Sequence, residues 1–425
     1  MRTKLYLAAL AALAASPACK WTEFDDLEGD TWVTATDKPN GDSTDYGVAL
    51  QRGRRMSPSN TEGARLVVIG NSQAQFTELE YSANGDVDLR PTAQKLNSQF
   101  GIGNLAIQPI LLADPTTDEV SLVVNSGGQS IAVLTGSGGL LAHQVFGPEQ
   151  PDAATYMLPP PNTTQPTPPI QVLVGADDAL YGAFVSNTPN PQPKCNVVDE
   201  AAAAIDVKGL GAARFAPSTT DDVLVWGVPK AGGMGKLIVY PGTVFGGCPT
   251  SPPTPQGPLA PWAPVETPFA PSDGSQIIMV DATHALLVGH KELGNIDSFL
   301  ALYRLDPAGK TITMVGAPVT VQNLRTAAIY DDGTKKYVVA GYPTALIDGV
   351  KSGQVSIYTL DLTAGIGSAP SLVLHDAQPD EEQQFGRAVA VTPFNGKPVI
   401  AVAADNEIFM YFRLDPIYGE TRTGR

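Results

Sequence analysis

The sequence predicts an all-β fold built from repeated units of short antiparallel strands. Residues 385–415 hold three apolar runs of five or six residues, rich in Val, Ile and aromatic residues and bounded by Gly, Pro, Asn or Asp. Such runs are typical of short strands, and three strands that are apolar on both faces need neighbours above and below. Seven units of this kind, spaced by about 56 residues on average, predict a seven-bladed β-propeller of antiparallel four-stranded blades.

Each unit shows three strong strands, and its outermost fourth strand is expected to be weak in sequence. First strands are expected at 46–50, 105–110, 153–158, 210–213, 276–280, 326–330 and 387–392. Second strands are expected at 64–70, 120–125, 171–176, 222–229, 285–289, 337–341 and 398–403, and third strands at 75–81, 130–134, 179–185, 235–240, 298–304, 353–358 and 408–412. The second-strand runs are apolar without alternation, which indicates burial on both faces.

Two further features bear on how the units pack. A glycine ends many second strands, at Gly70, Gly175, Gly227, Gly289 and Gly341. It indicates either a turn with positive φ or a close approach of another backbone. The segment 31–36 (TWVTAT) alternates cleanly, so we predict that it supplies the outer strand of the last unit and closes the ring.

The first 18 residues predict a signal peptide. Arg2 and Lys4 precede an apolar stretch, 5–15, that is too short to span a bilayer permanently, and small residues follow it. The sequence around Cys19, Ser-Pro-Ala-Cys, resembles the lipobox of bacterial lipoproteins. The resemblance implies that Cys19 is lipidated and, because Lys20 rather than Asp follows it, that the protein lies in the outer membrane. The alternative is ordinary cleavage near Ala18, which gives a secreted protein with a spare thiol.

The chain therefore divides into four segments, and its cysteines fit an exported protein. Residues 1–18 are the signal peptide, 19–45 a polar tether that carries the closing strand, 46–415 the propeller and 416–425 a C-terminal tail. An odd cysteine count in an exported protein suggests that one cysteine has a separate fate. If Cys19 is lipidated, Cys195 and Cys248 remain to form a disulfide between proline-rich insertions. No Cys-x-x-Cys motif or histidine cluster supports zinc instead.

The net charge of −16 and the lack of a basic patch argue against a nucleic-acid partner. Solubility explains the acidity most simply, although a cationic partner or divalent ions would also suit it. The sequence has no phosphate-binding or dinucleotide-binding loop and no Gly-x-Ser-x-Gly motif. We therefore predict no cofactor and no catalytic residues.

Three units resemble a known repeat. Leu210-Gly-Ala-Ala with the following VLVWGVP and GKLIVY runs looks like an FG-GAP repeat, as do Phe385-Gly with Val389-Ala and the unit around 337–358. These repeats build the seven-bladed propeller of integrin α-chains and many bacterial surface proteins. The resemblance implies that ligands bind on the face that carries the loops between second and third strands, here 229–234, 291–297 and 342–352. Candidate aromatic anchors there are Tyr342, Trp262 and Trp226. Trp226 is better interpreted as a core residue, because it lies inside an apolar strand.

The family often binds Ca²⁺ through Asp-x-Asp-x-Asp-Gly in the turn between first and second strands. Only Asp331-Asp332-Gly333 keeps part of this pattern, and Lys335 and Lys336 adjoin it. Asp114, Asp118 and Glu119 form a poorer candidate. Both acidic segments are better explained as solvated turns than as metal ligands, so no metal site is predicted. His284 and His290, which flank a strand, are interpreted as strand-end residues rather than as ligands.

The function expected from these features is a lipid-anchored, non-enzymatic binding or scaffolding protein, facing the cell surface or the periplasm. It would recognise a protein or glycan partner through loops on the propeller face, since long loops on a rigid scaffold commonly carry recognition. The alternative is a glycan-processing hydrolase or lyase that uses the central pocket. A third possibility is a structural envelope protein with no discrete ligand.

Overall fold

The structure of the chain is a computed structural model. It describes residues 33–37, 47, 49–52, 64–70, 75–81, 87–90, 110–112, 120–125, 130–135, 140–145, 151–157, 170–176, 179–185, 195–199, 205–213, 222–229, 232–240, 262–272, 275–289, 297–376, 379–381, 383–394, 397–405 and 407–411. All regular secondary structure in these residues is β-strand. No helix in the described part is long and apolar enough to cross a membrane.

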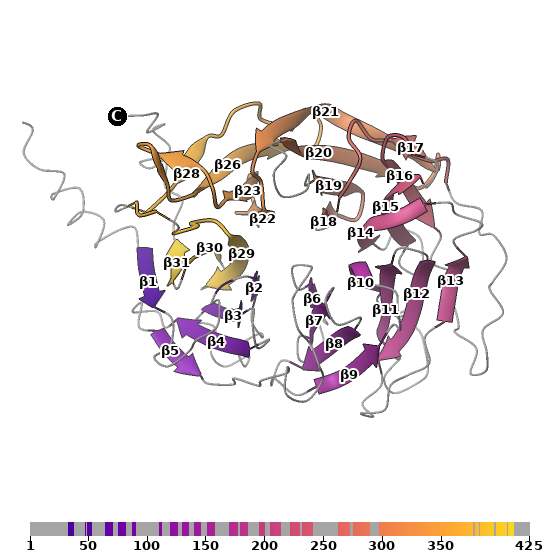
Figure 1. Cartoon of the computed structure of the whole chain (residues 1–425). Helices are drawn as coiled ribbons and strands as arrows, with labels where there is room; N and C mark the ends of the chain where they lie inside the picture. The colour runs from indigo at the N-terminus through magenta and orange to yellow at the C-terminus, as the bar shows by residue number, and fades with distance from the viewer. Residues whose placement is uncertain are drawn as a thin grey trace, which may run out of the picture.

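The described strands form seven antiparallel sheets of four or five strands, and five of them consist of strands that follow one another in the sequence (Figure 1). The first three contain β2 (Ala49–Arg52), β3 (Ala64–Gly70), β4 (Gln75–Tyr81) and β5 (Val87–Arg90); β6 (Ile110–Leu112), β7 (Val120–Asn125), β8 (Ser130–Thr135) and β9 (Leu140–Val145); and β10 (Pro151–Met157), β11 (Ile170–Ala176), β12 (Ala179–Val185) and β13 (Cys195–Asp199). The fourth and fifth contain β14 (Ile205–Ala213), β15 (Asp222–Pro229), β16 (Lys236–Tyr240) and β17 (Val265–Glu266); and β18 (Gln276–Asp281), β19 (His284–Gly289), β20 (Asp297–Asp306) and β21 (Thr311–Gln322).

The last two sheets are less regular. The sixth contains β22 (Thr326–Asp331), β23 (Lys336–Tyr342), β26 (Gln354–Asp361), β27 (Gly365–Ile366) and β28 (Leu372–Leu374). A separate hairpin, β24 (Leu346–Ile347) with β25 (Val350–Lys351), lies in the connection between β23 and β26. The seventh sheet joins β29 (Ala388–Phe394), β30 (Lys397–Ala404) and β31 (Glu407–Tyr411) to β1 (Val33–Asp37). β1 runs antiparallel to β31, with Val33 opposite Tyr411 and Asp37 opposite Glu407.

The first strands of the sheets lie toward the middle of the arrangement in Figure 1. Consecutive first strands are in contact in the order β2, β6, β10, β14, β18, β22 and β29, and β29 also contacts β2. The outermost positions in the picture belong to β5, β9, β13, β17, β21, β28 and β1. The sheets therefore share an orientation, with inner first strands and outer last strands.

The second strands whose burial is described throughout, β15, β19 and β23, are buried on both faces, as their apolar sequences predicted. In β15, Val225 packs in a cluster with β10 and β11, whereas its neighbour Trp226 packs with Leu287 of β19. In β19, Ala285 and Leu287 face the fourth sheet, while Leu286 and Val288 join a cluster with the sixth. Adjacent residues thus point into two different interfaces, and each interface between these sheets is an apolar core.

Among the glycines that end second strands, Gly175 and Gly341 mark close approaches of the next sheet rather than turns with positive φ. A Cβ on Gly341 would contact the carbonyl oxygen of Gly386, which belongs to the next sheet, and a Cβ on Gly175 would contact Val207, also of the next sheet. Neither glycine has a positive φ. The structure therefore decides between the two explanations that the sequence left open.

Most second and third strands lie where the sequence predicted them. Of the first strand predicted at 105–110, only Ile110 lies within the described residues, where it is the first residue of β6. The proline-rich insertions 186–198 and 243–271, which hold Cys195 and Cys248, contribute β13 and β17, the outermost strands of their sheets. Cys195 is consequently the first residue of a strand and not a loop residue.

The close approach at Gly341 predicts a large effect of a single methyl group. Gly341→Ala should lower the free energy of unfolding by about 2–3 kcal/mol, because the added Cβ meets backbone that has no room to move. Gly209→Ala is the matched control within a strand. Its Cβ would meet Ile277 and Trp226 at an ordinary 3.4 Å, so its stability should stay within about 1 kcal/mol of wild type. Urea denaturation measures both variants, and equal stabilities would contradict this packing.

Candidate binding face

One end of the sheets carries the connections between second and third strands and the links between consecutive sheets. We call it the loop face, and define it by residues 232–235, 323–325, 342–353, 375–376, 379–381, 383–387 and 405. Hydrogen bonds join these segments: Phe385 N–H donates to Ser352 O (2.7 Å), and Asp405 N–H donates to Gln383 O (2.5 Å). The sixth and seventh sheets therefore present one continuous surface at this end.

The β24–β25 hairpin rises from this face. Asp348 and Gly349 join its strands with φ values of +52° and +87°, the positive pair that a type I′ turn requires. Backbone hydrogen bonds hold its base, since Ala345 N–H donates to Tyr342 O (3.1 Å) and Gly353 N–H donates to Ala345 O (3.1 Å). The side chain of Leu346 lies on this hairpin and is 63% exposed.

Exposed large apolar side chains are few in the described residues. They are Leu346, Met234 (45% exposed) and Met314 (43% exposed). Leu346 and Met234 lie on connections between second and third strands, and Met314 lies on the outer strand β21. Two of the three are therefore on the loop face, where the sequence placed its candidate ligand loops.

A Phe-Gly turn fixes the base of the face between the sixth and seventh sheets. Phe385 is fully buried, and its ring meets that of Phe409 edge-on at 5.1 Å. Gly386 has a φ of +89°, and a Cβ there would lie 2.6 Å from Gln354 O, so no larger residue fits. The next residue, Arg387, is thereby held at the start of β29.

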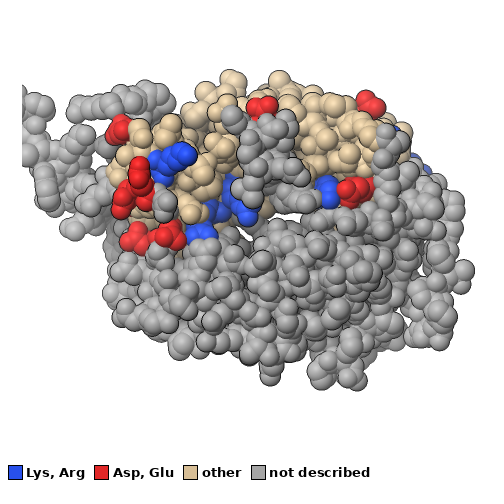
Figure 2. Space-filling view, viewed as in Figure 1, with Lys and Arg blue, Asp and Glu red and all other residues tan. Residues whose placement is uncertain are grey.

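Two arginines hold equivalent places in neighbouring sheets. Arg325 directly precedes β22 and Arg387 directly precedes β29, and these two inner strands are in contact. Arg387 Nη1 donates to Asp405 Oδ1 at 3.4 Å, and its side chain is only 10% exposed. Arg325 N–H donates to Gly341 O at 2.8 Å. In Figure 2, basic side chains gather over the region where β22 and β29 lie.

The surroundings of Arg325 oppose its charge. Neighbouring protein desolvates its guanidinium and lowers its pKa, and the positive charge of Arg387 lowers it further. Arg325 is nevertheless an exposed residue, so part of its side chain lies at the surface. Arginine stays ionised in proteins even so.

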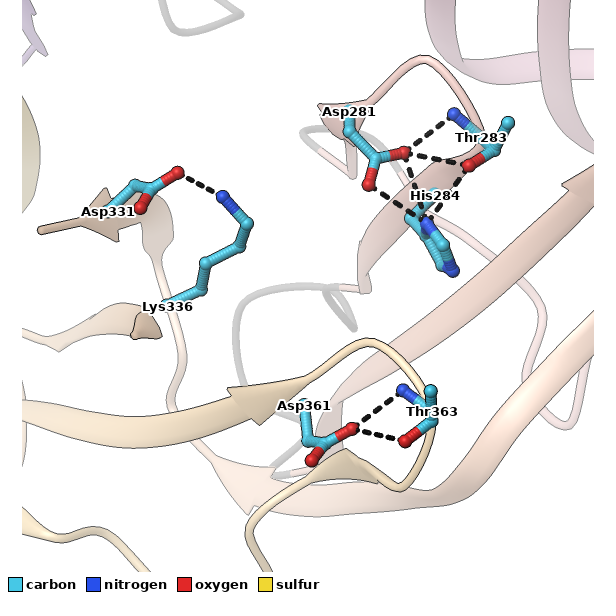
Figure 3. A network of polar contacts seen from close by, with 7 residues as sticks. All are labelled: Asp281, Thr283, His284, Asp331, Lys336, Asp361 and Thr363. Carbon is cyan, nitrogen blue, oxygen red and sulfur yellow. Dashed lines mark hydrogen bonds and ion pairs between the residues drawn. The ribbon is translucent and has the colours of Figure 1, made fainter. Parts of the chain in front are cut away.

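The opposite end of the fifth and sixth sheets carries acidic turns (Figure 3). Asp361 Oδ1 accepts from Thr363 N–H and Oγ1 and from Ala364 N–H at 2.7–3.0 Å. Asp332 repeats this with Thr334 and Lys335, and Asp281 accepts from Thr283 N–H and Oγ1. These carboxylates cap their own turns.

The carboxylates of Asp331 and Asp332, in the turn that keeps part of the calcium pattern, form hydrogen bonds and an ion pair within the protein. Asp331 accepts from Gly333 N–H and forms an ion pair with Lys336, while Asp332 caps its turn. Within the described ranges, no three His, Cys, Asp or Glu side chains group as a metal site. The other candidates, Asp114, Asp118 and Glu119, lie outside the described side chains.

The proposal from the sequence that Tyr342 and Trp262 are aromatic anchors is wrong, whereas the interpretation of Trp226 as a core residue is confirmed. Tyr342, Trp226 and Trp262 are all buried. Trp226 Nε1 donates to Thr267 Oγ1 (3.2 Å) and its ring meets Phe299 edge-on, and Tyr342 shares a hydrogen bond with the hydroxyl of Tyr358 (3.1 Å). The residues that the face does expose are Leu346 and Met234, and the Asp348-Gly349 pair is the sequence signal that could have located the hairpin.

The remaining sequence-based site residues are placed only in part. His284 Nδ1 lies 3.0 Å from the carboxylate of Asp281 at the end opposite the loop face. His290 lies outside the described residues, so the structure does not pair it with His284. Cys19 and Cys248 also lie outside them, and the side chain of Cys195 is not described, so lipidation and the disulfide stay predictions.

Comparison with solved structures establishes the fold. A chain of the polycomb repressive complex 2 of Chaetomium thermophilum is 10% identical, with a TM-score of 0.54 over 90% of this chain and 98% of that one. A chain of the apo complex in an autoinhibited state (ctPRC2) is 11% identical, with a TM-score of 0.53 over 91% and 99%. BBS1N, solved with ARL6DN, is 10% identical, with a TM-score of 0.49 over 89% and 96%.

These relatives are β-propeller proteins, and at such low identity the likeness shows the fold alone. No family model and no curated protein matches the chain. The chain is therefore an all-β protein of antiparallel four-stranded sheets with a β-propeller fold.

The acidic turns predict a dependence of stability on pH. Hydrogen bonds from Thr363 and Ala364 lower the pKa of Asp361, and those from Lys335 and Thr334 lower that of Asp332. A carboxyl with a lowered pKa in the folded state stabilises the fold above its unfolded pKa of about 4. That contribution is lost as the pH falls through the folded pKa.

The double variant Asp332→Asn, Asp361→Asn keeps the acceptor oxygens but cannot titrate. Its urea midpoint should therefore fall less steeply than that of wild type between about pH 5 and pH 2. The difference should be small, because solvent screens exposed carboxylates. If the urea midpoints of the two proteins fall equally steeply with pH, these turns do not contribute to the pH dependence of stability.

Proposed function

We propose that this chain is a non-enzymatic binding or scaffolding protein of the cell envelope, held to the outer membrane by a lipid on Cys19. It recognises a protein or glycan partner through its loop face. The observation that carries the proposal is Leu346, an apolar side chain presented to solvent on a hairpin whose base is hydrogen-bonded to a packed core. Exposed apolar side chains at fixed positions commonly mark interaction sites.

The scaffold that we propose is an FG-GAP-like propeller whose seven sheets are seven blades of one closed ring. Two features support it: the contacts between first strands return from β29 to β2, and β1 pairs with β31. In this arrangement the N-terminal segment and the end of the propeller share one blade. The tether that follows Cys19 then leads directly into the scaffold.

The experiment is a cross-linking pull-down from intact cells that express the wild type, Leu346→Ser or Met314→Ser. Met314→Ser is the matched control, since it removes an exposed apolar side chain from outside the loop face. Wild type and Met314→Ser should capture the same specific partner, and Leu346→Ser should capture at least about tenfold less, as expected when an interface anchor is lost.

A Cys19→Ser form tests the membrane anchor in the same assay. It should leave the membrane fraction and lose the partner at the envelope, while the purified protein still binds it. Equal capture by all forms would contradict the proposal, and so would the absence of any specific partner.

A further inference from the structure

Arg325 and Arg387 directly precede two inner strands that are in contact, β22 and β29, so both arginines lie at the loop face. Both are fixed by their backbones at the start of inner strands, Arg325 through Gly341 O and Arg387 through Ala403 O and Gln384 O. Ion pairs elsewhere in the described part join Lys208 with Asp206 and Lys336 with Asp331. Arg387 is paired with Asp405, but no described carboxylate lies within ion-pair distance of Arg325.

This arrangement has an electrostatic cost in the absence of a ligand. The charge of Arg387 disfavours that of Arg325, and neighbouring protein desolvates the Arg325 guanidinium, which has no carboxylate partner among the described residues. Desolvation and like-charge repulsion both disfavour a charged group. An anion placed between the guanidinium groups would relieve both effects, and the planar guanidinium matches an oxyanion with two parallel hydrogen bonds.

We propose that Arg325 and Arg387 bind a carboxylate from an acidic segment of a partner protein at the centre of the loop face. This inference rests on the proposed function, because it specifies the chemistry of the partner that the face recognises. Arg325 is the primary donor. Arg387, which Asp405 orients, supplies the second guanidinium.

A carboxylate suits the local charge better than a phosphate. Asp405 already offsets part of the positive charge at Arg387, so the charge left for a ligand is that of Arg325. A carboxylate carries a single negative charge and balances it. A phosphate monoester carries about −1.5 to −2 near pH 7 and would leave excess negative charge beside Asp405.

A peptide segment suits the face better than an acidic glycan. Leu346 stands on the connection between β23 and β26, at the same end of the same sheet as Arg325. A ligand that covers both residues needs an apolar side chain as well as an acid. Polypeptides supply this combination readily, whereas glycans present hydroxyl groups and no aliphatic side chains.

The test is selection of a random peptide library, displayed on phage, against the purified wild-type chain and against Arg325→Gln. The matched control is Lys310→Gln, which removes one positive charge from an exposed turn away from the loop face. An array of uronate-bearing and sialylated glycans is screened in parallel. The dissociation constant of the most enriched peptide is then measured for each variant and for Arg325→Lys.

Wild type should enrich peptides that combine Asp or Glu with an apolar residue. Arg325→Gln should bind the enriched peptide at least about tenfold more weakly, as for the loss of one charge-assisted hydrogen bond. Arg325→Lys should recover part of that affinity, and Lys310→Gln should match wild type. Replacing the acidic residue of the peptide by its amide should weaken binding to wild type much more than binding to Arg325→Gln, in which only Arg387 remains to contact the carboxylate.

Other outcomes separate this inference from the proposed function. If peptide binding depends on Leu346 but not on Arg325, the loop face binds a partner and the carboxylate inference is wrong. If only acidic glycans bind and Arg325→Gln abolishes their binding, the peptide assignment is wrong. If wild type enriches no peptide and no glycan, both the inference and the proposed function are contradicted.

Discussion

The fold depends on one constraint: the described sheets of the second half are apolar on both faces. In β15, β19 and β23 adjacent residues enter different cores, so each of these sheets needs a neighbour on either side. A linear stack would leave its two end sheets with an exposed apolar face, whereas a ring has no end sheets. Glycine sets the spacing, because Gly341 lets the carbonyl of Gly386 approach and brings the sixth and seventh sheets into contact.

This packing separates the parts that build the scaffold from the parts that are free to bind. The cores occupy the middle of each sheet, so the strand ends carry the variable chemistry. At one end, aspartates cap their own turns and their oxygens are used within the protein. At the other, a hairpin presents Leu346, and the Phe-Gly turn that fixes Phe385 in the core also positions Arg387. The same residues that hold two sheets together thus place candidate binding groups.

Much of the fold could be predicted from the sequence, and the reasons are local. Second strands such as β3, β7 and β15 lie at the predicted residues because they are uninterrupted apolar runs with clear boundaries. Outer strands such as β13 and β17 are short and lie in proline-rich insertions, so their sequences carry little signal. The binding face was harder to predict, since Tyr342 and Trp262 are buried by tertiary contacts that their local sequences do not indicate. The pairing of Arg325 with Arg387 depends on two sheets that meet only in three dimensions.

The most direct test of the account is whether the N-terminal strand completes the scaffold. Deleting residues 20–37 removes β1 and leaves the outer edge of β31 without a partner, whereas deleting residues 20–30 shortens the tether and keeps β1. The melting temperatures of the two purified proteins should be compared with that of the wild type. The account predicts that the longer deletion lowers the melting temperature by several degrees and that the shorter one leaves it unchanged. If the protein with the longer deletion has the same melting temperature as the wild type, this would contradict a ring closed by its N-terminal strand.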